Sequence, residues 1–319
     1  MSRKEATTPG QWAFGQALLL IAGMISLVYA AKAGFGGNQT LPFVVAIASF
    51  GIVMLRLFVI RQLRSDNPML DLSLFAHPAI VAGIIMALVA TGALAGVELT
   101  LAQELQYVLG KTPLEAGLFM IPIMAAAALG SPVAGVLSNR FGLRLVATGS
   151  LLIGAGGLAY LGRADFHDPG WLVPASLAMV GLTLSIGLTA SSIAIMGSVA
   201  AEKGSAAGSL EGTGYELGAG LGITLFGVFM ANIFSRAIVV PTDLALPLAQ
   251  QASRSIGDAY LVANQLPAAQ GAALIAAGKA AFSAAHVTLL SVAAGVIAAL
   301  AIAVYFLLAS YRPAGTSPQ

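Results

Sequence analysis

The feature that most constrains this chain is a series of long uncharged stretches, each long enough to cross a bilayer. The run between Glu5 and Lys32 holds 26 uncharged residues, and so does the run between Asp71 and Glu98. About 20 apolar residues in a helix span the roughly 30 Å of hydrocarbon in a membrane. In lipid the backbone groups of a segment must bond within that segment, so these runs predict helices. With 58% hydrophobic and 9% charged residues, a water-soluble fold is excluded.

The fold class expected is therefore an all-α integral membrane protein with about eight transmembrane helices. The alternative, a barrel of strands, fails because the segments do not alternate and are about twice as long as a barrel strand. The expected spans are residues 12–31, 40–60, 78–104, 114–138, 145–163, 171–198, 205–235 and 284–310.

The positions of Lys and Arg predict the orientation of these spans. With a cytoplasmic N-terminus, the short outer loops hold only Lys32, Lys111 and Arg163, and the basic excess lies inside, as the positive-inside rule requires. The inner residues are Arg3, Lys4, Arg56, Arg61, Arg64, Arg140, Arg144, Lys203 and Arg312. Both termini, residues 1–11 and 312–319, are then cytoplasmic.

The one long connection, residues 236–279, then lies outside. Its pieces Leu248–Leu266 and Ala268–Ala281 are read as helices lying on the membrane surface. A partly ordered linker is an equal alternative.

Several kinds of chemistry are absent from the sequence. The chain has no cysteine, which excludes disulfides, thiolate catalysis and Cys-ligated metal. His77, His167 and His286 fall at the edges of the expected spans and form no metal-binding pattern. No phosphate-binding loop or hydrolase motif occurs, and a net charge of +2 gives no indication of nucleic acid. We therefore expect no enzyme activity, no metal and no bound cofactor.

Four glutamates inside the expected spans are the candidate functional groups: Glu98, Glu104, Glu211 and Glu216. Each ionised group costs about 3 kcal/mol or more near the bilayer centre, and no span offers an obvious basic partner. A low dielectric favours the neutral form of a carboxyl group, so such a group can exchange protons and, when ionised, attract a cation. The alternative is a boundary glutamate whose side chain reaches water.

Depth ranks these glutamates. Glu216 lies 12 residues past Gly204, or roughly 18 Å along a helix, near the middle of the bilayer. Glu98 lies in the outer half of its span, Glu211 about two turns inside, and Glu104 close to the outer boundary, where substitution should be milder. Glu211 and Glu216 are about 140° apart around a helix, so they do not share one narrow face.

Glycines and prolines mark the packing of two spans. Gly214, Gly218 and Gly222 form two overlapping Gly-x-x-x-Gly steps, which allow close approach of helix backbones. Pro122 and Pro132 predict a kink in the span at 114–138.

The segment between the fourth and fifth spans resembles the loop motif of the major facilitator superfamily, Gly-x-Leu-Ala-Asp-Arg-x-Gly-Arg-Arg/Lys. The matching residues are Gly135, Leu137, Arg140, Gly142 and Arg144. Asn139 replaces the usual aspartate and Leu143 the first basic residue. Residues 105–117 look like the ninth-to-tenth helix connection of fourteen-helix drug:proton antiporters. Residues 211–222 look like the thirteenth helix of the branch that exports methyl viologen and quaternary ammonium biocides.

This resemblance implies two linker helices at 12–76 and a C-terminal six-helix bundle at 77–311. It implies a multi-pass protein of the bacterial inner membrane that exports organic cations in exchange for protons, with the proton gradient as energy source. The N-terminal bundle of the family has no counterpart here, so the partners implied are lipid, organic cations, and a missing bundle or partner half. The alternatives are a truncated, non-transporting remnant and, with less support because no filter-like sequence occurs, an ion channel.

The expected topology can be tested by labelling single cysteines, since the background has none. A cysteine at Asp258 should react with a membrane-impermeant maleimide applied from outside, because the basic-residue bias places 236–279 there. Labelling of that cysteine from the cytoplasmic side only would overturn the orientation.

Overall fold

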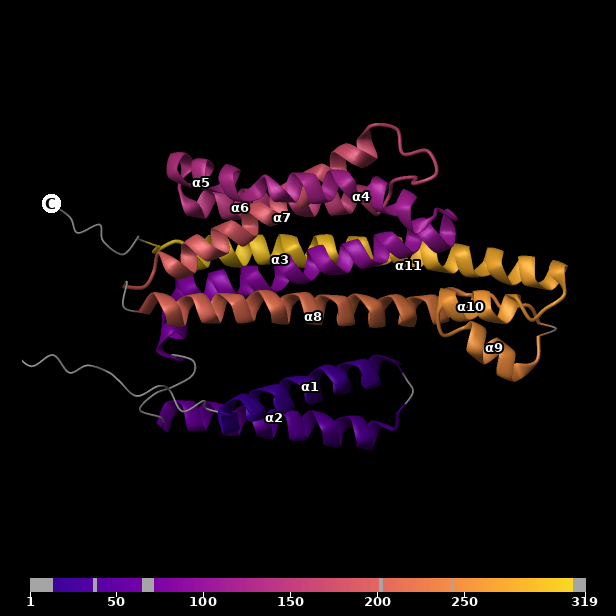
Figure 1. Ribbon diagram of the computed structural model, residues 1–319, viewed down its shortest axis with the longest axis horizontal. Coiled ribbons are helices and arrows are strands. Elements are labelled where there is room, and N and C mark those ends of the chain that lie inside the picture. Colours follow the sequence, from indigo (N-terminus) through magenta and orange to yellow (C-terminus); the bar gives the residue numbers. More distant parts are fainter. Residues whose placement is uncertain (1–13, 37–38, 65–71, 201–202, 243, 312–319) are drawn as a thin grey trace, which may run out of the picture. The chain divides into compact units, whose positions relative to one another are not determined.

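The computed structural model describes residues 14–36, 39–64, 72–200, 203–242 and 244–311 (Figure 1). The chain forms two compact units, Met1–Ser73 and Leu74–Gln319. The terminal segments 1–11 and 312–319, expected to be cytoplasmic, lie outside the described residues.

The first unit is a pair of helices, α1 (Phe14–Gly36) and α2 (Leu41–Arg64). The two helices meet at glycines: a Cβ added to Gly51 would lie 3.0 Å from the Gly23 carbonyl oxygen. Near one end, the Gln62 side-chain amide donates to the Gln16 side-chain oxygen at 2.9 Å.

The second unit contains the remaining helices, which follow one another in chain order. They are η1 (Leu72–Ala76, which begins at the unit boundary), α3 (Pro78–Gln103), the π-helical turn η2 (Glu104–Val108), α4 (Pro113–Ala128), α5 (Gly130–Phe141), α6 (Leu143–Leu161), α7 (Leu172–Met196), α8 (Gly204–Ala237), α9 (Leu246–Ala252), α10 (Ile256–Ala263) and α11 (Ala268–Leu307). All regular structure among the described residues is helical, and eight helical stretches there are long and apolar enough to cross a membrane. The predicted fold class is confirmed.

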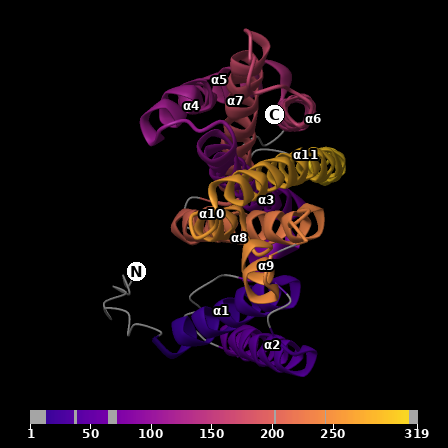
Figure 2. The same cartoon turned by 90° about the vertical axis from the view of Figure 1, so that its right-hand side faces the viewer.

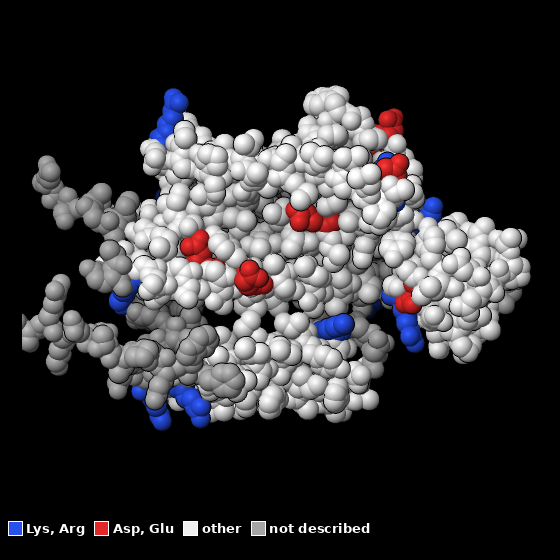
Figure 3. All heavy atoms as spheres, viewed as in Figure 1, with Lys and Arg blue, Asp and Glu red and all other residues white. Residues whose placement is uncertain are grey.

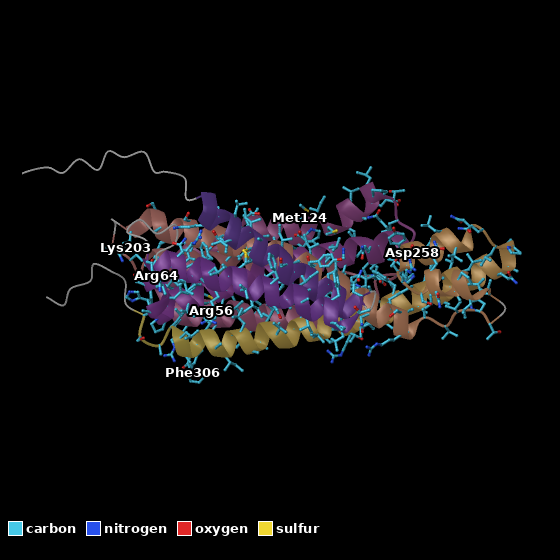
Figure 4. All side chains as sticks on the ribbon, turned by 90° about the horizontal axis from the view of Figure 1, so that it is seen from below. Arg56, Arg64, Met124, Lys203, Asp258 and Phe306 are labelled. Carbon is cyan, nitrogen blue, oxygen red and sulfur yellow. The ribbon has the colours of Figure 1, made fainter. Side chains whose placement is uncertain are left out.

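The long helices of the second unit stack in layers. Figures 1 and 2 both show α3 and α11 between α8 on one side and α4 to α7 on the other. The main apolar core lies where α3, α6, α7 and α11 meet and includes Met86, Leu151, Leu184 and Ile297. Lys203 and Phe306 lie near one end of this unit and Asp258 near the other (Figure 4). We call these the Lys203 end and the Asp258 end.

The span expected at 114–138 is one helical stretch, Pro113–Phe141, that is interrupted at Leu129, so the predicted kink is present and divides it into α4 and α5. Thr112 and Glu115 form a capping box that starts α4, with Pro113 at its first turn. The helix then breaks between Ala128 and Gly130, although Pro122 stays inside α4. Pro132 supplies the cause, because it has no N–H for the carbonyl of residue 128.

The end of the long connection also differs from expectation. Residues 268–281 do not form a separate surface helix, because α11 runs unbroken from Ala268 to Leu307. Residues 248–266 divide into α9 and α10, with Ser255 as N-cap of α10. At 40 residues, α11 is about 60 Å long, so it extends well beyond the hydrocarbon. Its overhang packs on α10 and the end of α8 through Leu274, Phe282 and Phe234.

The backbones of α3 and α8 are in close contact along a row of glycines. A Cβ added to Gly222 would meet the Gly92 backbone, with the Gly92 carbonyl carbon at 2.6 Å, and one added to Gly218 would lie 2.5 Å from the Leu88 carbonyl oxygen. Gly214 faces Ala87 in the same row. Because these pairs advance together along both chains, α3 and α8 run parallel, with their backbones in contact.

Replacing Gly222 with alanine should therefore loosen this contact. The added methyl group meets backbone atoms that cannot rotate away, so we expect a loss of about 1–3 kcal/mol. Gly220→Ala is the matched control: nothing lies within 4 Å of a Cβ there, and alanine favours the helix by about 0.5–1 kcal/mol. Thermal unfolding in detergent should show a lower midpoint for Gly222→Ala only; equal midpoints for the two variants would contradict the contact.

Candidate functional site

The four candidate glutamates lie on two neighbouring helices. Glu98 is on α3 and Glu104 opens the π-helical turn that extends it, while Glu211 and Glu216 are on α8. Figure 3 shows acidic side chains midway along the second unit, whereas Lys and Arg side chains lie toward its two ends. The structure gives each carboxylate a different environment.

Glu216 lies on the face of α8 that points away from α3. Its side chain is exposed, and no hydrogen bond or ion pair joins it to another described residue. Gly212 and Gly220, one turn to either side, are also exposed and have nothing within 4 Å of an added Cβ. Glu216 thus projects from a strip of small residues on α8 that no other described element of the second unit covers.

Glu98 is half-buried on α3. Like Glu216, it has no hydrogen-bond or ion-pair partner among the described residues. Gly96, two residues earlier, packs against the ring of Phe226 on α8. Glu98 is about 200° farther around α3, so it lies on a different face from the α3–α8 contact.

Glu211 is bonded within the bundle. The Tyr215 hydroxyl lies 2.6 Å from Glu211 Oε1, 3.2 Å from the Leu188 carbonyl oxygen and 3.4 Å from Ser191 Oγ. Leu188 and Ser191 belong to α7. This network ties α8 to α7 and occupies one oxygen of the Glu211 carboxylate.

Glu104 is buried, although its sequence position suggests a boundary residue that reaches water. It is 4% exposed; Ser283 donates to its Oε1 at 2.6 Å, and His286 Nδ1 lies 3.7 Å from its Oε2. His286 is also buried, at 2% exposed, although its sequence position suggests a polar residue at a span boundary. The cause is the length of α11, which begins 16 residues before the expected start of the last span.

A cavity of about 200 Å³ adjoins this cluster and is lined by Glu104, Asp165, His167, Ser283 and His286 together with apolar residues. Asp165 and His167 are in the connection after α6, with exposed side chains 3.3 Å apart. The His167 backbone N–H donates to Asp165 Oδ1 at 2.8 Å and lowers the pKa of that carboxyl group, so Asp165 stays ionised to lower pH than usual.

The residues expected to form a loop motif are mostly helical. Gly135, Asn139 and Arg140 lie in α5, and only Gly142, with φ of 83°, interrupts the helical path before α6. That φ is in the left-handed region, where glycine is favoured. Arg144 is in the first turn of α6.

Arg144 joins α6 to the end of α11. Its Nε donates to the Tyr305 carbonyl oxygen at 2.7 Å, and its guanidinium lies 3.7 Å from the centre of the Tyr305 ring. Arg140, by contrast, lies 5.5 Å from the ring of its neighbour Phe141. Of the two arginines of the motif, Arg144 therefore links α6 to α11 at the Lys203 end.

No group of three or more His, Cys, Asp or Glu among the described residues is placed to hold a metal ion. The sequence does not predict that Glu104, Ser283 and His286 form a cluster. Glu104 and His286 are far apart in sequence, so only the packing of α11 on η2 brings them together.

The two arginines can be compared by Arg→Lys substitution, which keeps the charge but removes the planar fork and its stacking. Arg144→Lys should lower the free energy of unfolding by about 1 kcal/mol, because it loses the bond to the Tyr305 carbonyl and the ring contact. Arg140→Lys should change stability by less than about 0.5 kcal/mol. Thermal unfolding in detergent measures both; a larger loss for Arg140→Lys would contradict the assignment.

Comparison with known proteins gives a consistent relationship. No protein-family model matches the chain. The methyl viologen resistance protein SmvA of Salmonella typhimurium is 41% identical over 295 residues, covering 92% of this chain and 60% of SmvA. The multidrug efflux pump LfrA of Mycolicibacterium smegmatis is 32% identical over 279 residues, covering 86% of this chain and 54% of LfrA.

A solved structure has the same fold. It is a bacterial homologue of the human lysosomal transporter Spinster, in an inward-facing and occupied conformation, with a TM-score of 0.53 and 18% identity over 94% of this chain and 70% of that one. The chain spans about 60% or less of the length of SmvA and LfrA. The helical fold and the sequence similarity together show that the chain is a multi-pass membrane protein homologous to multidrug and methyl viologen resistance transporters of the major facilitator superfamily.

Proposed function

We propose that this chain forms the C-terminal part of a proton-coupled efflux transporter of the bacterial inner membrane, with both termini in the cytoplasm. Its substrates would be organic cations such as methyl viologen or quaternary ammonium compounds. The similarity to SmvA and LfrA supports efflux and favours a transporter over a non-transporting remnant. The observation that carries the proposal is the uncovered face of α8 around Glu216.

That face is polar and small over several turns. Ser205, Ser209, Gly212, Glu216 and Gly220 are all exposed and follow one another at helical spacing along α8. Such a face offers little apolar surface for contact with lipid. An ionised glutamate that faces acyl chains costs about 3 kcal/mol or more. The face therefore suits a water-filled cavity or a further bundle of helices better than lipid.

The substrate path would run along this face. In transporters built from two bundles, the substrate site lies between the bundles near the bilayer midplane. Glu216 is 12 residues from the start of α8, or roughly 18 Å along it, which suits that depth. The opposite wall would come from a part of the protein outside this sequence or from another chain.

Glu216 would couple cation export to proton uptake because its carboxylate binds either the cation or a proton, but not both at once. As an anion it attracts an organic cation, since opposite charges interact strongly in a low dielectric. Once a proton binds the carboxylate, that attraction is lost and the cation is released. The proton then leaves on the side of lower proton concentration, and the cycle repeats. Of the four candidate glutamates, half-buried Glu98 on the neighbouring helix is the other one without a bonded partner among the described residues.

Glu216→Gln should abolish proton-coupled export, because glutamine keeps the shape of the side chain but neither ionises nor binds a proton. The measurement is proton movement driven by a cationic dye in inverted vesicles that contain the transport-competent protein. At matched protein levels, we expect the signal to fall at least tenfold, to that of empty vesicles.

Asp168→Asn is the matched control, because it removes an exposed carboxylate in the connection between α6 and α7 and should leave export unchanged. Normal export by Glu216→Gln would make Glu216 a structural residue and would transfer the coupling role to Glu98.

A further inference from the structure

We propose that Glu104, Ser283 and His286 form a second proton-binding site, separate from Glu216 and reached through the cavity beside Asp165 and His167. That this site serves export rests on the function proposed above; that it binds a proton does not.

The first argument is the burial of two ionisable side chains side by side. Glu104 and His286 are 4% and 2% exposed, and they come from η2 and from α11. Phe166 and Phe282 pack around the imidazole, with ring centres 6.1 and 6.4 Å from it. Burying a carboxyl group and an imidazole among aromatic rings is costly unless their polar atoms are bonded, so their joint presence calls for an explanation.

The second argument is that their bonding is incomplete. Ser283 satisfies Glu104 Oε1, but Glu104 Oε2 and His286 Nε2 are buried with no hydrogen-bond partner. The 3.7 Å between Oε2 and His286 Nδ1 is too long for a direct hydrogen bond. One carboxylate oxygen and one ring nitrogen are therefore left free to take a proton or a water molecule.

The third argument is access. The adjoining cavity, at about 200 Å³, is well above the roughly 30 Å³ that one water molecule occupies in the liquid. Its wall includes both buried groups and the exposed side chains of Asp165 and His167. Water in this cavity would connect the buried pair with the surface at the Asp258 end, and would bridge the gap between Oε2 and the imidazole.

The charge balance then defines what the site holds. With an ionised Glu104 and a neutral His286 the cluster carries one negative charge. One proton added to Glu104 Oε2, which has no hydrogen-bond partner, makes the total zero. Among the described residues, Asp165 and His167 are the other ionisable groups in the cavity wall. Other described ionisable groups near this end do not line it: Tyr107, Lys111, Glu115, Arg163, Asp168, Arg236, Arg254, Asp258, Tyr260 and Lys279. No fixed cation in the wall takes the place of the proton.

The site is distinct from Glu216 in position. Leu88 of α3 is level with Gly218 of α8, and Glu104 lies 16 residues farther along the same helical path. This separation is roughly 24 Å. A proton on Glu104 therefore does not directly neutralise Glu216, and the cluster is suited to exchanging protons with one side of the membrane.

The test is pH-difference infrared spectroscopy on the purified chain in nanodiscs, which detects the carbonyl band of a protonated carboxylic acid without any transport. We expect a titrating band that disappears in Glu104→Gln and remains in Glu115→Gln, whose carboxylate caps α4 and is exposed. His286→Gln should move the midpoint of that band by about one pH unit or more, a tenfold change in proton affinity.

Ser283→Ala is a milder variant, which keeps the proposal testable if the Glu104 or His286 variants fail to fold. It removes the donor to Glu104 Oε1 and should shift the frequency of the band without abolishing it. A spectrum without a band assignable to Glu104, or a midpoint unchanged by His286→Gln, would overturn the proposal and make the cluster structural.

A transport assay separates this proposal from the preceding one. In transport-competent vesicles, Glu104→Gln should move the dependence of export on the pH of the Asp258 side by about one pH unit, whereas Glu216→Gln should abolish export at every pH. Export lost in Glu216→Gln without a Glu104 band refutes only the second site. A Glu104 band with normal export in Glu216→Gln refutes only the coupling role of Glu216.

Discussion

The arrangement of the second unit depends on the backbone contact between α3 and α8. Helices in lipid gain little from burying apolar side chains against one another, because the acyl chains are equally apolar. Close packing of small residues takes the place of that driving force. At Gly92 and Gly222 the two backbones touch with no room for a Cβ, and this contact sets which way α8 faces.

The orientation of α8 then decides the environments of its two carboxylates. With Gly214, Gly218 and Gly222 turned toward α3, Glu216 must point to the opposite side. Glu211, on a different face, reaches Tyr215 and through it α7. The same glycine row therefore produces, five residues apart, one carboxylate that is bonded and one that has no bonded partner among the described residues.

The π-helical turn at Glu104–Val108 has a comparable role at the Asp258 end. Such turns are rare in proteins as a whole, and those that occur are often found at functional sites. Here the turn carries Glu104 at its start, and the Tyr107 carbonyl oxygen accepts a hydrogen bond of 2.6 Å from Tyr260 on α10. The overhanging part of α11 packs against the same turn and supplies Ser283 and His286. The cluster is therefore buried because α3 continues into η2 and because α11 begins before the expected start of the last span.

The sequence by itself determined the helical class, the number of spans and most of their limits, because the length of an apolar run is set by the thickness of the bilayer. It also singled out the glycine row and the four intramembrane glutamates, since their cost in lipid can be assessed without any partner. The loop motif could be recognised, but not its helical conformation, because a single glycine at 142 is enough to make the turn. Only the tertiary structure decided which carboxylate is free, which is bonded and which is buried beside a histidine. Those properties depend on contacts between helices that are distant in sequence. A hydropathy pattern does not show which side chains of a neighbouring helix a given side chain contacts.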